Sequence, residues 1–576
     1  MSGSGTNGSG TNESNKDVKI DKRKTDERET GQSKEDQSKA DQSKVDESKP
    51  ENSKTHKSKP DESKSKGNNT NESQEDAANT SDSSTNNPEE QYRWTESQIK
   101  KIFAGSADVL IQACCYGNDR EAAPPVIMVY AEGLSHSTDI GRYILPEVSR
   151  LYGEGGLSQG PLLGLSKVLP ISPLHQLTDE KLTEVVFNGD LLLLFTETGE
   201  ACSINISDKP TRTPFESSTE ISVKGPRDGF VEDVTVNVAL IRKRLRSPSL
   251  HVEYMTLGAR TKTRIGLLYF YDIVNPAILK GIKTKLNQID VDGILSISHL
   301  EEMMTDSKFK LLPIMDFTGR PDFAVNSLLS GRLVIIVDGL PMVLIAPAGI
   351  SLILKSPEDA HFNYAYVSFA RVIRGISLFL SIFLPAIWVA LMSFHQDQIP
   401  FRMMATISIT RLGLPLSSHM EMFLLLMLLE IFREAGVRLP SAIGQTLTSI
   451  GGLIIGDAAI RAGLVSPSVV VVGAITAVSG VTLVNQTLST QVSIMRFFFF
   501  VLSAIFGMYG VILGMVLLIG YMASLRPFGL PYLAPLSPLN PKELLLSFFR
   551  MPWSMMKKRP VALNTVDSDK GGEDTE

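Results

Sequence analysis

Three long stretches without a charged residue constrain this chain more than any other feature. They cover 375–394, 464–484 and 497–525, and they are 20, 21 and 29 residues long. About 20 apolar residues cross the hydrocarbon core of a bilayer as a helix, and the third stretch is long enough to cross with tilt. Two weaker apolar segments, 422–429 and 443–460, adjoin or contain acidic residues. The sequence therefore predicts an α-helical polytopic membrane domain over 366–528, with about four to five membrane segments.

Cations flank this region on both sides. Arg371 and Arg374 precede the first stretch, Lys is absent from 356 to 541, and Lys or Arg follows at 542, 550, 557, 558 and 559. Because cytoplasmic loops carry an excess of cations, we expect the C-terminal tail, 529–576, and the N-terminus in the cytoplasm. This orientation requires an even number of crossings. Four spans plus a short or re-entrant segment near 416–432 satisfy it, whereas five full spans do not.

Several charged residues lie in or beside the apolar segments, where a lipid-facing charge costs roughly 2.5–3.5 kcal/mol at mid-helix. They are Glu421, Glu430, Arg433, Glu434, Arg438, Asp457 and Arg461. Asp457 and Arg461 are four residues apart, so they share a helix face and can neutralise each other. Glu430 with Arg433, or Glu434 with Arg438, can pair in the same way. The charges either line a polar interface or ion path, or they neutralise one another between packed helices.

Small residues predict close packing of helices in this region. Gly452 with Gly456, and Gly510 with Gly514, form two GxxxG motifs, which let helix backbones approach each other. Pro385 and Pro467 can kink or break helices. At membrane depth such a break is tolerated only where protein or water satisfies the freed carbonyls.

The first 91 residues are a different kind of polymer. They contain 15 Lys/Arg, 20 Asp/Glu and seven hydrophobic residues, so they carry −5 of the formal charge of −6. Ser-Lys pairs recur every five residues from Ser33 to Ser63, a period that matches neither helix nor strand. So little apolar surface cannot offset the entropy of ordering, and we predict a disordered tail, either solvated without a specific partner or acting as a tether. Because its first residues form no apolar run, the N-terminus is expected to stay in the cytoplasm.

Between the tail and the membrane region we predict an α+β cytoplasmic module of two subdomains, 92–175 and 176–365. The Gly- and Pro-rich stretch 153–173 suggests the boundary. Strands are expected at 109–116, 126–131, 250–257 and 263–271, and helices at 139–151, 230–246 and 275–288. Asn188-Gly189 and Asp338-Gly339 predict two β-hairpins, the first with 185–187 as a strand.

Motifs that carry chemistry are scarce. The sequence has no phosphate loop, no CxxC pair and no HExxH, and its eight histidines lack ligand spacing. We therefore predict no enzyme, no metal and no cofactor. Three cysteines exclude a small disulfide scaffold, and the nearly neutral charge outside the tail argues against a nucleic-acid binder. A basic run at 242–246 is either a solvated helix end or a site for anionic lipid or nucleic acid.

The sequence resembles the A subunit of the GerA-type spore germinant receptors over roughly residues 92–553. The strongest block is REAGVRLP, IGQT, GGLIIG and AGLVSP, at 433–440, 443–446, 451–456 and 462–467. Supporting motifs are GPRDGF at 225–230, NVALIRKR at 237–244, RPD at 320–322, VDG at 337–339 with Pro341, and PYLAP at 531–535. The sequence departs from the family pattern at Gly319, Asp457, Gly480 and Asn485.

The resemblance implies a multi-pass subunit of the spore inner membrane that works with a transporter-like B subunit and a lipoprotein C subunit. In that family the germinant is thought to bind the B subunit, whereas A subunits are thought to oligomerise and to form an ion channel. Asp457 adds a membrane charge, so ion-path details at that position stay open. The alternatives are a non-conducting membrane scaffold and the A-subunit-like accessory of the spore dipicolinate channel, against which the long tail argues. The nutrient, the oligomer number and the pore-lining helix stay open.

Overall fold

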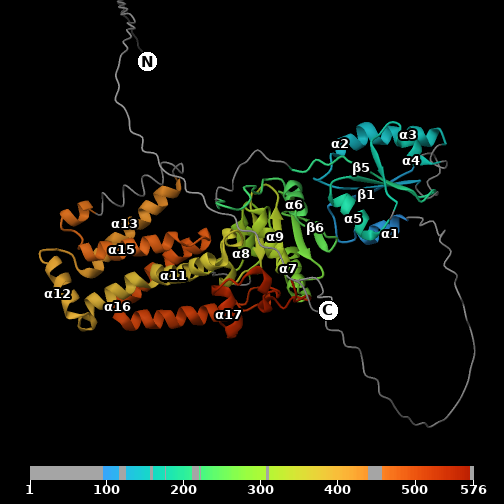
Figure 1. Cartoon of the computed structure of the whole chain (residues 1–576). Coiled ribbons are helices and arrows are strands. Elements are labelled where there is room, and N and C mark those ends of the chain that lie inside the picture. Colours follow the sequence, from blue (N-terminus) through green and yellow to red (C-terminus); the bar gives the residue numbers. More distant parts are fainter. Residues whose placement is uncertain are drawn as a thin grey trace, which may run out of the picture. The chain divides into compact units, whose positions relative to one another are not determined.

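The structure is a computed structural model that describes residues 95–115, 125–155, 160–175, 177–210, 220, 222–305, 311–438 and 457–570. The predicted disordered tail and the Gly452–Gly456 motif lie outside these residues. Two five-stranded antiparallel sheets and a group of long helices make up the described chain (Figure 1). The expected fold class, an α+β module followed by helices, is confirmed at this level.

The first sheet has the strand order β1-β2-β4-β5-β3. Its strands are β1 (Val109–Cys114), β2 (Val126–Ala131), β3 (Ile171–Pro173), β4 (Leu191–Phe195) and β5 (Ala201–Ile204). Helices α1 (Glu96–Ile102) and α5 (Asp179–Phe187) cover one face, and α3 (Leu145–Gly153) and α4 (Pro161–Leu165) cover the other (Figure 1). Two short helices, α2 (Ser137–Asp139) and η1 (Ile140–Ile144), lead into α3. Alternate strand residues point to opposite faces, so Ile127 and Val129 of β2 pack toward α1 and α5, and Val126 and Met128 pack toward α3 and α4.

The structure differs from two expectations in this region. A boundary at residue 175 would divide the sheet, because β4 and β5 pair with β2 and β3. Residues 185–187 form the last turn of α5 and not a strand. Thr178 caps this helix by accepting a 3.3 Å hydrogen bond from the amide of Lys181, and Leu182 and Val186 bury its face against the sheet. The chain then turns at Gly189, with a φ of +87°, into β4.

The second sheet has the order β6-β7-β9-β10-β8. Its strands are β6 (Leu250–Leu257), β7 (Thr263–Phe270), β8 (Asp316–Thr318), β9 (Leu333–Val337) and β10 (Val343–Ala346). The Asp338-Gly339 hairpin is confirmed, since β9 and β10 pair antiparallel. Helices α6 (Val234–Arg242) and α9 (Pro321–Leu329) cover one face, and α7 (Pro276–Asn287) and α8 (Ile297–Met303) cover the other. After β10, α10 (Ile350–Ile353) and η2 (Pro357–Ala360) lead to the long helices.

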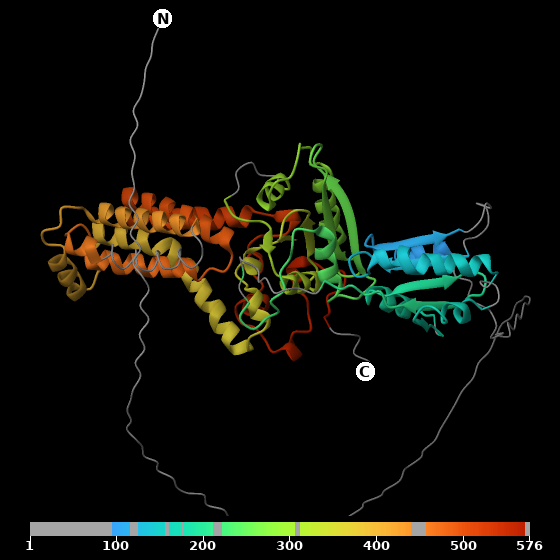
Figure 2. The same cartoon turned by 90° about the horizontal axis from the view of Figure 1, so that it is seen from above.

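The expected membrane region is helical. It contains α11 (Tyr364–Ser393), η3 (Gln396–Gln398), α12 (Phe401–Thr410), α13 (Ser418–Arg438), α15 (Pro467–Val481) and α16 (Gln486–Ser524). Among the described residues, α11 and α16 are long and apolar enough to cross a membrane, and α15 is a shorter apolar helix. α11 packs against both α15 and α16 (Figures 1 and 2). Pro385 lies inside α11, whereas Pro467 occupies the first turn of α15 and breaks nothing.

The chain reverses direction within α16. Asn485, before its first residue, bonds Asp316, and the Tyr521 hydroxyl accepts a 3.0 Å hydrogen bond from the amide of Leu311. A straight helix would separate residues 485 and 521 by about 54 Å, whereas five residues of chain between 311 and 316 span at most about 18 Å. The reversal is at Gly507, which has φ +62° and ψ −141°. The apolar stretch 497–525 is therefore part of a helical hairpin and not one long span.

The second GxxxG motif packs within this hairpin. A Cβ on Gly514 would lie 2.7 Å from Cε1 of Phe499, and a Cβ on Gly510 would meet the carbonyl of Leu502. In a continuous helix, residues 499 and 514 would be about 22 Å apart along the axis. Both glycines therefore leave room for the preceding arm of the same hairpin.

One hydrophobic core joins the second subdomain to the long helices. It contains Val334 and Ile345 of the second sheet, Phe383 of α11, Phe499 of α16, and Tyr532. The C-terminal segment then returns to the second subdomain through η4 (Pro527–Gly529), α17 (Pro541–Phe548), η5 (Trp553–Met555) and η6 (Val561–Leu563). There the amide of Val566 donates a 3.0 Å hydrogen bond to the carbonyl of Ile273.

Candidate functional site

Two buried polar side chains join β8 to the start of α16. Asn485 donates a 2.6 Å hydrogen bond from Nδ2 to Oδ1 of Asp316. Its own Oδ1 accepts a 2.8 Å hydrogen bond from the amide of Leu488, so Asn485 is also the N-cap of α16. Asp316 is 4% and Asn485 9% exposed. One side chain thus both begins an apolar helix and fastens it to the second sheet.

The surroundings of Asp316 disfavour its ionised form. Burial raises the pKa of Asp316 from 3.8 to about 7, and the neighbouring Glu220 carboxylate adds to the shift, while hydrogen-bond donors and Arg332 oppose it. Burial also raises the pKa of Glu220, although its carboxylate accepts a 2.5 Å hydrogen bond from Oγ1 of Thr318. Both carboxyl groups line a cavity of about 10 Å³, roughly the space of one water molecule.

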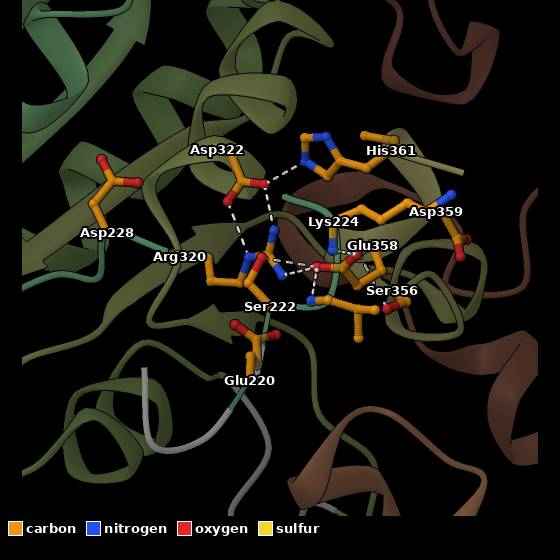
Figure 3. A network of polar contacts seen from close by, with 12 residues as sticks. Glu220, Ser222, Lys224, Asp228, Arg320, Asp322, Ser356, Glu358, Asp359 and His361 are labelled. Atoms are coloured by element: carbon orange, nitrogen blue, oxygen red, sulfur yellow. Dashed lines mark hydrogen bonds and ion pairs between the residues drawn. The ribbon is translucent and has the colours of Figure 1, made fainter. Parts of the chain in front are cut away.

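A second polar network surrounds Arg320 at the start of α9. Its Nε and Nη2 donate to the two carboxylate oxygens of Asp322, at 3.1 and 2.7 Å, and its Nη1 donates to Oε1 of Glu358 at 2.5 Å. The His361 ring lies 2.8 Å from Oδ2 of Asp322 on the opposite side (Figure 3). Arg320 is only 2% exposed. The RPD motif therefore holds η2 and the residue after it against the second subdomain.

Glu358 connects this network to the 222–224 segment. Its carboxylate accepts 3.2 Å hydrogen bonds from the amides of Val223 and Lys224. Burial alone would raise the pKa of Glu358, but Arg320 and these amides outweigh it and lower the pKa to about 2. A Cβ on Gly225 would collide with the Arg320 guanidinium. The glycine that opens the GPRDGF motif therefore leaves the space in which the guanidinium sits.

The residue after Glu358 reaches the first long helix. Asp359 accepts a 2.9 Å hydrogen bond from Nε of Arg371 and a 2.5 Å one from Nη2 of Arg374, both on α11. Burial would raise the pKa of Asp359, but the two arginines outweigh it and lower the pKa. Arg371 and Arg374 are thus ion-paired. We call Asp316, Arg320, Glu358, Asp359 and Asn485, with their partners, the junction.

Among the predicted membrane charges whose side chains the structure describes, Glu421 is the most deeply buried. It is 0% exposed, and its Oε2 accepts hydrogen bonds from the amide (3.0 Å) and the hydroxyl (2.7 Å) of Ser466. Its Oε1 lies 3.1 Å from Nη2 of Arg411. Glu421 therefore ties the start of α13 to the residue that precedes α15, through contacts that a sequence cannot reveal.

The other predicted membrane charges have different surroundings. Glu430 pairs with Arg433 on α13, and Asp457 pairs with Arg461 at 2.8 Å, as the helical spacing predicts. The second pair is largely exposed, with side-chain exposures of 55% and 79%. Glu434 is exposed, and the side chain of Arg438 lies outside the described part. Glu421, Glu430 and Asp457 thus have three different cationic partners.

A buried arginine that the sequence pattern does not single out lies between α11 and α16. Arg496 is 6% exposed and donates to the carbonyl (2.9 Å) and the hydroxyl (2.8 Å) of Ser381. A Cβ on Gly480 would lie 3.3 Å from both Nη2 of Arg496 and Oγ of Ser381, so the glycine at this position leaves room for the contact. In the sequence, Arg496 directly precedes the charge-free stretch 497–525. A cation bordering such a stretch is the signal that could have identified it.

The described residues of the junction make contacts that hold structural elements together. No group of three or more His, Cys, Asp or Glu residues within the described ranges is arranged to hold a metal ion. Its charged groups are engaged with one another, with backbone amides or with helix termini. Such contacts fix the relative positions of a sheet, a loop and two helices.

These features define a class of protein: an α+β module whose core continues into long apolar helices, with buried polar contacts joining the two. Residues 97–562 match the family described as Bacillus/Clostridium GerA spore germination protein. The chain belongs to this family, which confirms the resemblance in its motifs.

Two spore germination proteins agree with this assignment. The chain is 39% identical over 476 residues to spore germination protein XA of Bacillus anthracis, covering 82% of this chain and 96% of that protein. It is 33% identical over 482 residues to spore germination protein KA of Bacillus subtilis (strain 168), covering 83% and 88%. A crystal structure of the N-terminal domain of the A subunit of the Bacillus megaterium spore germinant receptor GerK3 matches with a TM-score of 0.33 and 28% identity, covering 44% of this chain and 92% of that one.

Proposed function

We propose that this chain is the A subunit of a nutrient germinant receptor in the spore inner membrane. Its family and its relatives among spore germination proteins support a role in germination. Its long apolar helix α11 and the apolar hairpin α16 support a place in the membrane. In this proposal the chain forms a homo-oligomer and works with a transporter-like B subunit and a lipoprotein C subunit. The germinant binds the partner B subunit.

The observation that carries the mechanism is the Asp316–Asn485 contact. Asn485 is the N-cap of α16 and is bonded to Asp316 of β8. A movement of this helix therefore either moves β8 with it or breaks a buried hydrogen bond. In the proposed mechanism, germinant binding shifts the helices, the junction transmits the shift to the module, and the oligomer opens an ion-conducting path. Glu421 and Arg496 are the buried charged groups best suited to contribute to that path.

We further propose that both ends of the membrane region face the cytoplasm. Arg371 and Arg374, in the N-terminal half of α11, pair with Asp359, and Tyr521, near the end of α16, contacts Leu311. The region therefore enters and leaves beside the same subdomain. An even number of crossings follows from this, with the two arms of α16 as separate crossings. The native cysteines Cys114, Cys115 and Cys202 are first replaced by serine. In that background, single cysteines at Val484→Cys and Ser524→Cys should react only with a cytoplasmic thiol reagent, and Phe506→Cys only with an external one. Labelling of all three from one side would contradict the hairpin topology.

A non-conducting scaffold is the second candidate function. The pairing of Glu421, Glu430 and Asp457 favours it, because packed helices require their charges to be neutralised. Potassium flux from vesicles that contain the chain, with and without its proposed partners, separates the two functions. A conducting subunit should release potassium and change its flux on Glu421→Gln, whereas a scaffold should release none.

Deletion of the gene tests the receptor role itself. Spores that lack the chain should fail to germinate in response to one class of nutrient while responding normally to others. Restoring the wild-type gene should restore the response. Normal germination of the deletion strain to every nutrient, in a strain without a redundant receptor, would contradict the receptor role.

A further inference from the structure

A stripe of exposed apolar side chains on α11 extends beyond its charge-free stretch toward the module. It consists of Tyr366, Phe369, Ile373 and Ile376, which are 57%, 65%, 38% and 55% exposed. Spacings of three and four residues place them on one helix face. Arg371 and Arg374 interrupt the apolar sequence here, but their guanidinium groups pair with Asp359. The exposed face of α11 therefore remains apolar on the module side of Arg371, as far as Tyr366.

α17 lies beside this part of α11. The carbonyl of Ser547 accepts a 3.3 Å hydrogen bond from Nη1 of Arg371, and the amide of Arg550 donates a 2.9 Å hydrogen bond to Oγ of Ser368. A Cβ on Gly375 would be 3.4 Å from the ring of Phe548. These contacts place α17 at the level of residues 368–375, where the charge-free stretch of α11 starts.

α17 and the residues after it expose large apolar side chains and cations together. Leu545, Leu546, Phe549 and Trp553 are 52%, 46%, 47% and 62% exposed. Lys542, Lys557 and Lys558 are exposed as well, and residues 541–560 hold five cations against one carboxylate. An apolar face with basic neighbours is typical of segments that lie in the interface of an anionic membrane. Trp and Tyr are also enriched at that depth.

We propose that α17 and η5 form, with the first turns of α11, an interfacial collar that binds anionic lipid. The collar consists of Tyr366, Phe369, Leu545, Leu546, Phe549 and Trp553, which enter the boundary between headgroups and acyl chains. Lys542, Lys557 and Lys558 bind the anionic headgroups. The inference rests on the proposed membrane placement of α11, and it adds a lipid class and a site to it. The collar fixes the depth of α11 in the membrane, and α11 is the helix whose arginines pair with Asp359 of the junction.

Quenching by brominated lipids tests the collar in the full-length chain. Trp553 becomes the only tryptophan when Trp94→Phe and Trp388→Phe are combined. Two vesicle preparations contain phosphatidylcholine and phosphatidylglycerol, and in each preparation a different one of the two lipids is brominated near the headgroup. Trp553 fluorescence should be quenched more when phosphatidylglycerol is the brominated lipid than when phosphatidylcholine is. Since each lysine near an anionic surface contributes a factor of up to about five, combining Lys542→Gln, Lys557→Gln and Lys558→Gln should bring the ratio of the two quenching effects to about one.

Two controls separate the possible failures. A single tryptophan at Phe498→Trp, on the exposed side of α16, should be quenched regardless of headgroup in every variant. Lys100→Gln with Lys101→Gln, on α1, should leave the Trp553 ratio unchanged. Quenching at 498 without quenching at Trp553, or a headgroup ratio that survives the triple lysine substitution, would overturn the collar. Absence of quenching at both positions would instead refute the membrane placement of the helices. If Trp553 is shielded from the brominated lipid only when the other receptor subunits are co-expressed, the collar is a contact surface for a partner protein and the lipid proposal is wrong.

Discussion

Asn485 and Asp316 are 169 residues apart in sequence and are joined by a 2.6 Å hydrogen bond between nearly inaccessible side chains. Asp316 belongs to the shortest strand of the second sheet, and Asn485 precedes the 39-residue helical hairpin. The contact is a direct polar connection between the module and an apolar helix. The function that we propose depends on it.

Asp316 should make the stability of the chain depend on pH between about 4 and about 7. Its pKa is about 7 in the folded state and 3.8 ordinarily, so within this window the folded chain holds a proton that the unfolded chain has lost. Raising the pH therefore favours unfolding, by an amount on the order of a few kcal/mol across the window. Above and below the window this contribution is constant.

Asp316→Asn keeps an oxygen that accepts from Asn485 and removes the ionisable group. The advantage of this variant in thermal stability, measured in detergent, should grow with pH and level off above about 7. Carboxylates with lowered pKa values, such as Glu358, are present in both proteins. Their contributions therefore cancel when the stability of the wild-type chain is subtracted from that of the variant. A difference that does not vary with pH would show that Asp316 does not titrate there.

Arg320→Lys should destabilise the chain by roughly 1–3 kcal/mol, although the charge is kept. A lysine cannot serve both oxygens of Asp322 and also Glu358, so buried acceptors lose donors. The matched control is Arg260→Lys, because Arg260 and its partner Asp292 are 82% and 78% exposed. Chemical unfolding of both variants measures the difference, and equal stability of the two would refute the structural role of the RPD network.

Glu421→Gln should destabilise the chain by roughly 1–3 kcal/mol more than Asp457→Asn. Glu421 is fully buried with Ser466 and Arg411, so the amide leaves Arg411 without its counter-charge. The Asp457–Arg461 pair is exposed, and exposed pairs contribute about 0–1 kcal/mol. Melting temperatures of the two variants in the same detergent provide the measurement. A larger loss for Asp457→Asn would reverse our ranking of these charges.

Gly507→Ala should weaken the hairpin, at a cost of about 1–3 kcal/mol, because its backbone conformation is one that only glycine adopts readily. The added Cβ would also lie 2.9 Å from the ring of Phe394. Gly520→Ala is the control within the same element, since nothing lies within 4 Å of its Cβ position, and alanine favours a helix by up to about 1 kcal/mol. If both substitutions stabilise the chain equally in thermal unfolding, the reversal at Gly507 is wrong.

Local patterns in the sequence predicted much of the fold. The strands 250–257 and 263–271 and the helix 275–288 follow from short-range periodicity and capping, and β6, β7 and α7 match them closely. The pairing of β4 and β5 with the first sheet was missed, because which strands pair is a long-range property that local pattern does not encode. Similarly, a charge-free stretch with few polar positions has no clear periodicity that could reveal the reversal at Gly507.

The candidate site was less predictable than the fold. Helical spacing correctly paired Glu430 with Arg433 and Asp457 with Arg461, since those partners are within one turn. The buried environment of Glu421 depends on Ser466, 45 residues away, and the junction depends on contacts over still longer separations. In the sequence, the RPD motif indicates only a family resemblance, whereas in the structure Arg320 donates to Asp322 and Glu358.

Potassium release from germinating spores tests most directly whether the junction couples the module to the membrane helices. Spores carrying wild-type chain, Asn485→Ala or Asp457→Asn at equal protein levels would be exposed to a panel of nutrients. Asn485→Ala removes both the bond to Asp316 and the helix cap, and it should slow or abolish nutrient-triggered potassium release. Asp457→Asn should release potassium as wild-type does. Wild-type release from Asn485→Ala spores would contradict coupling through the junction.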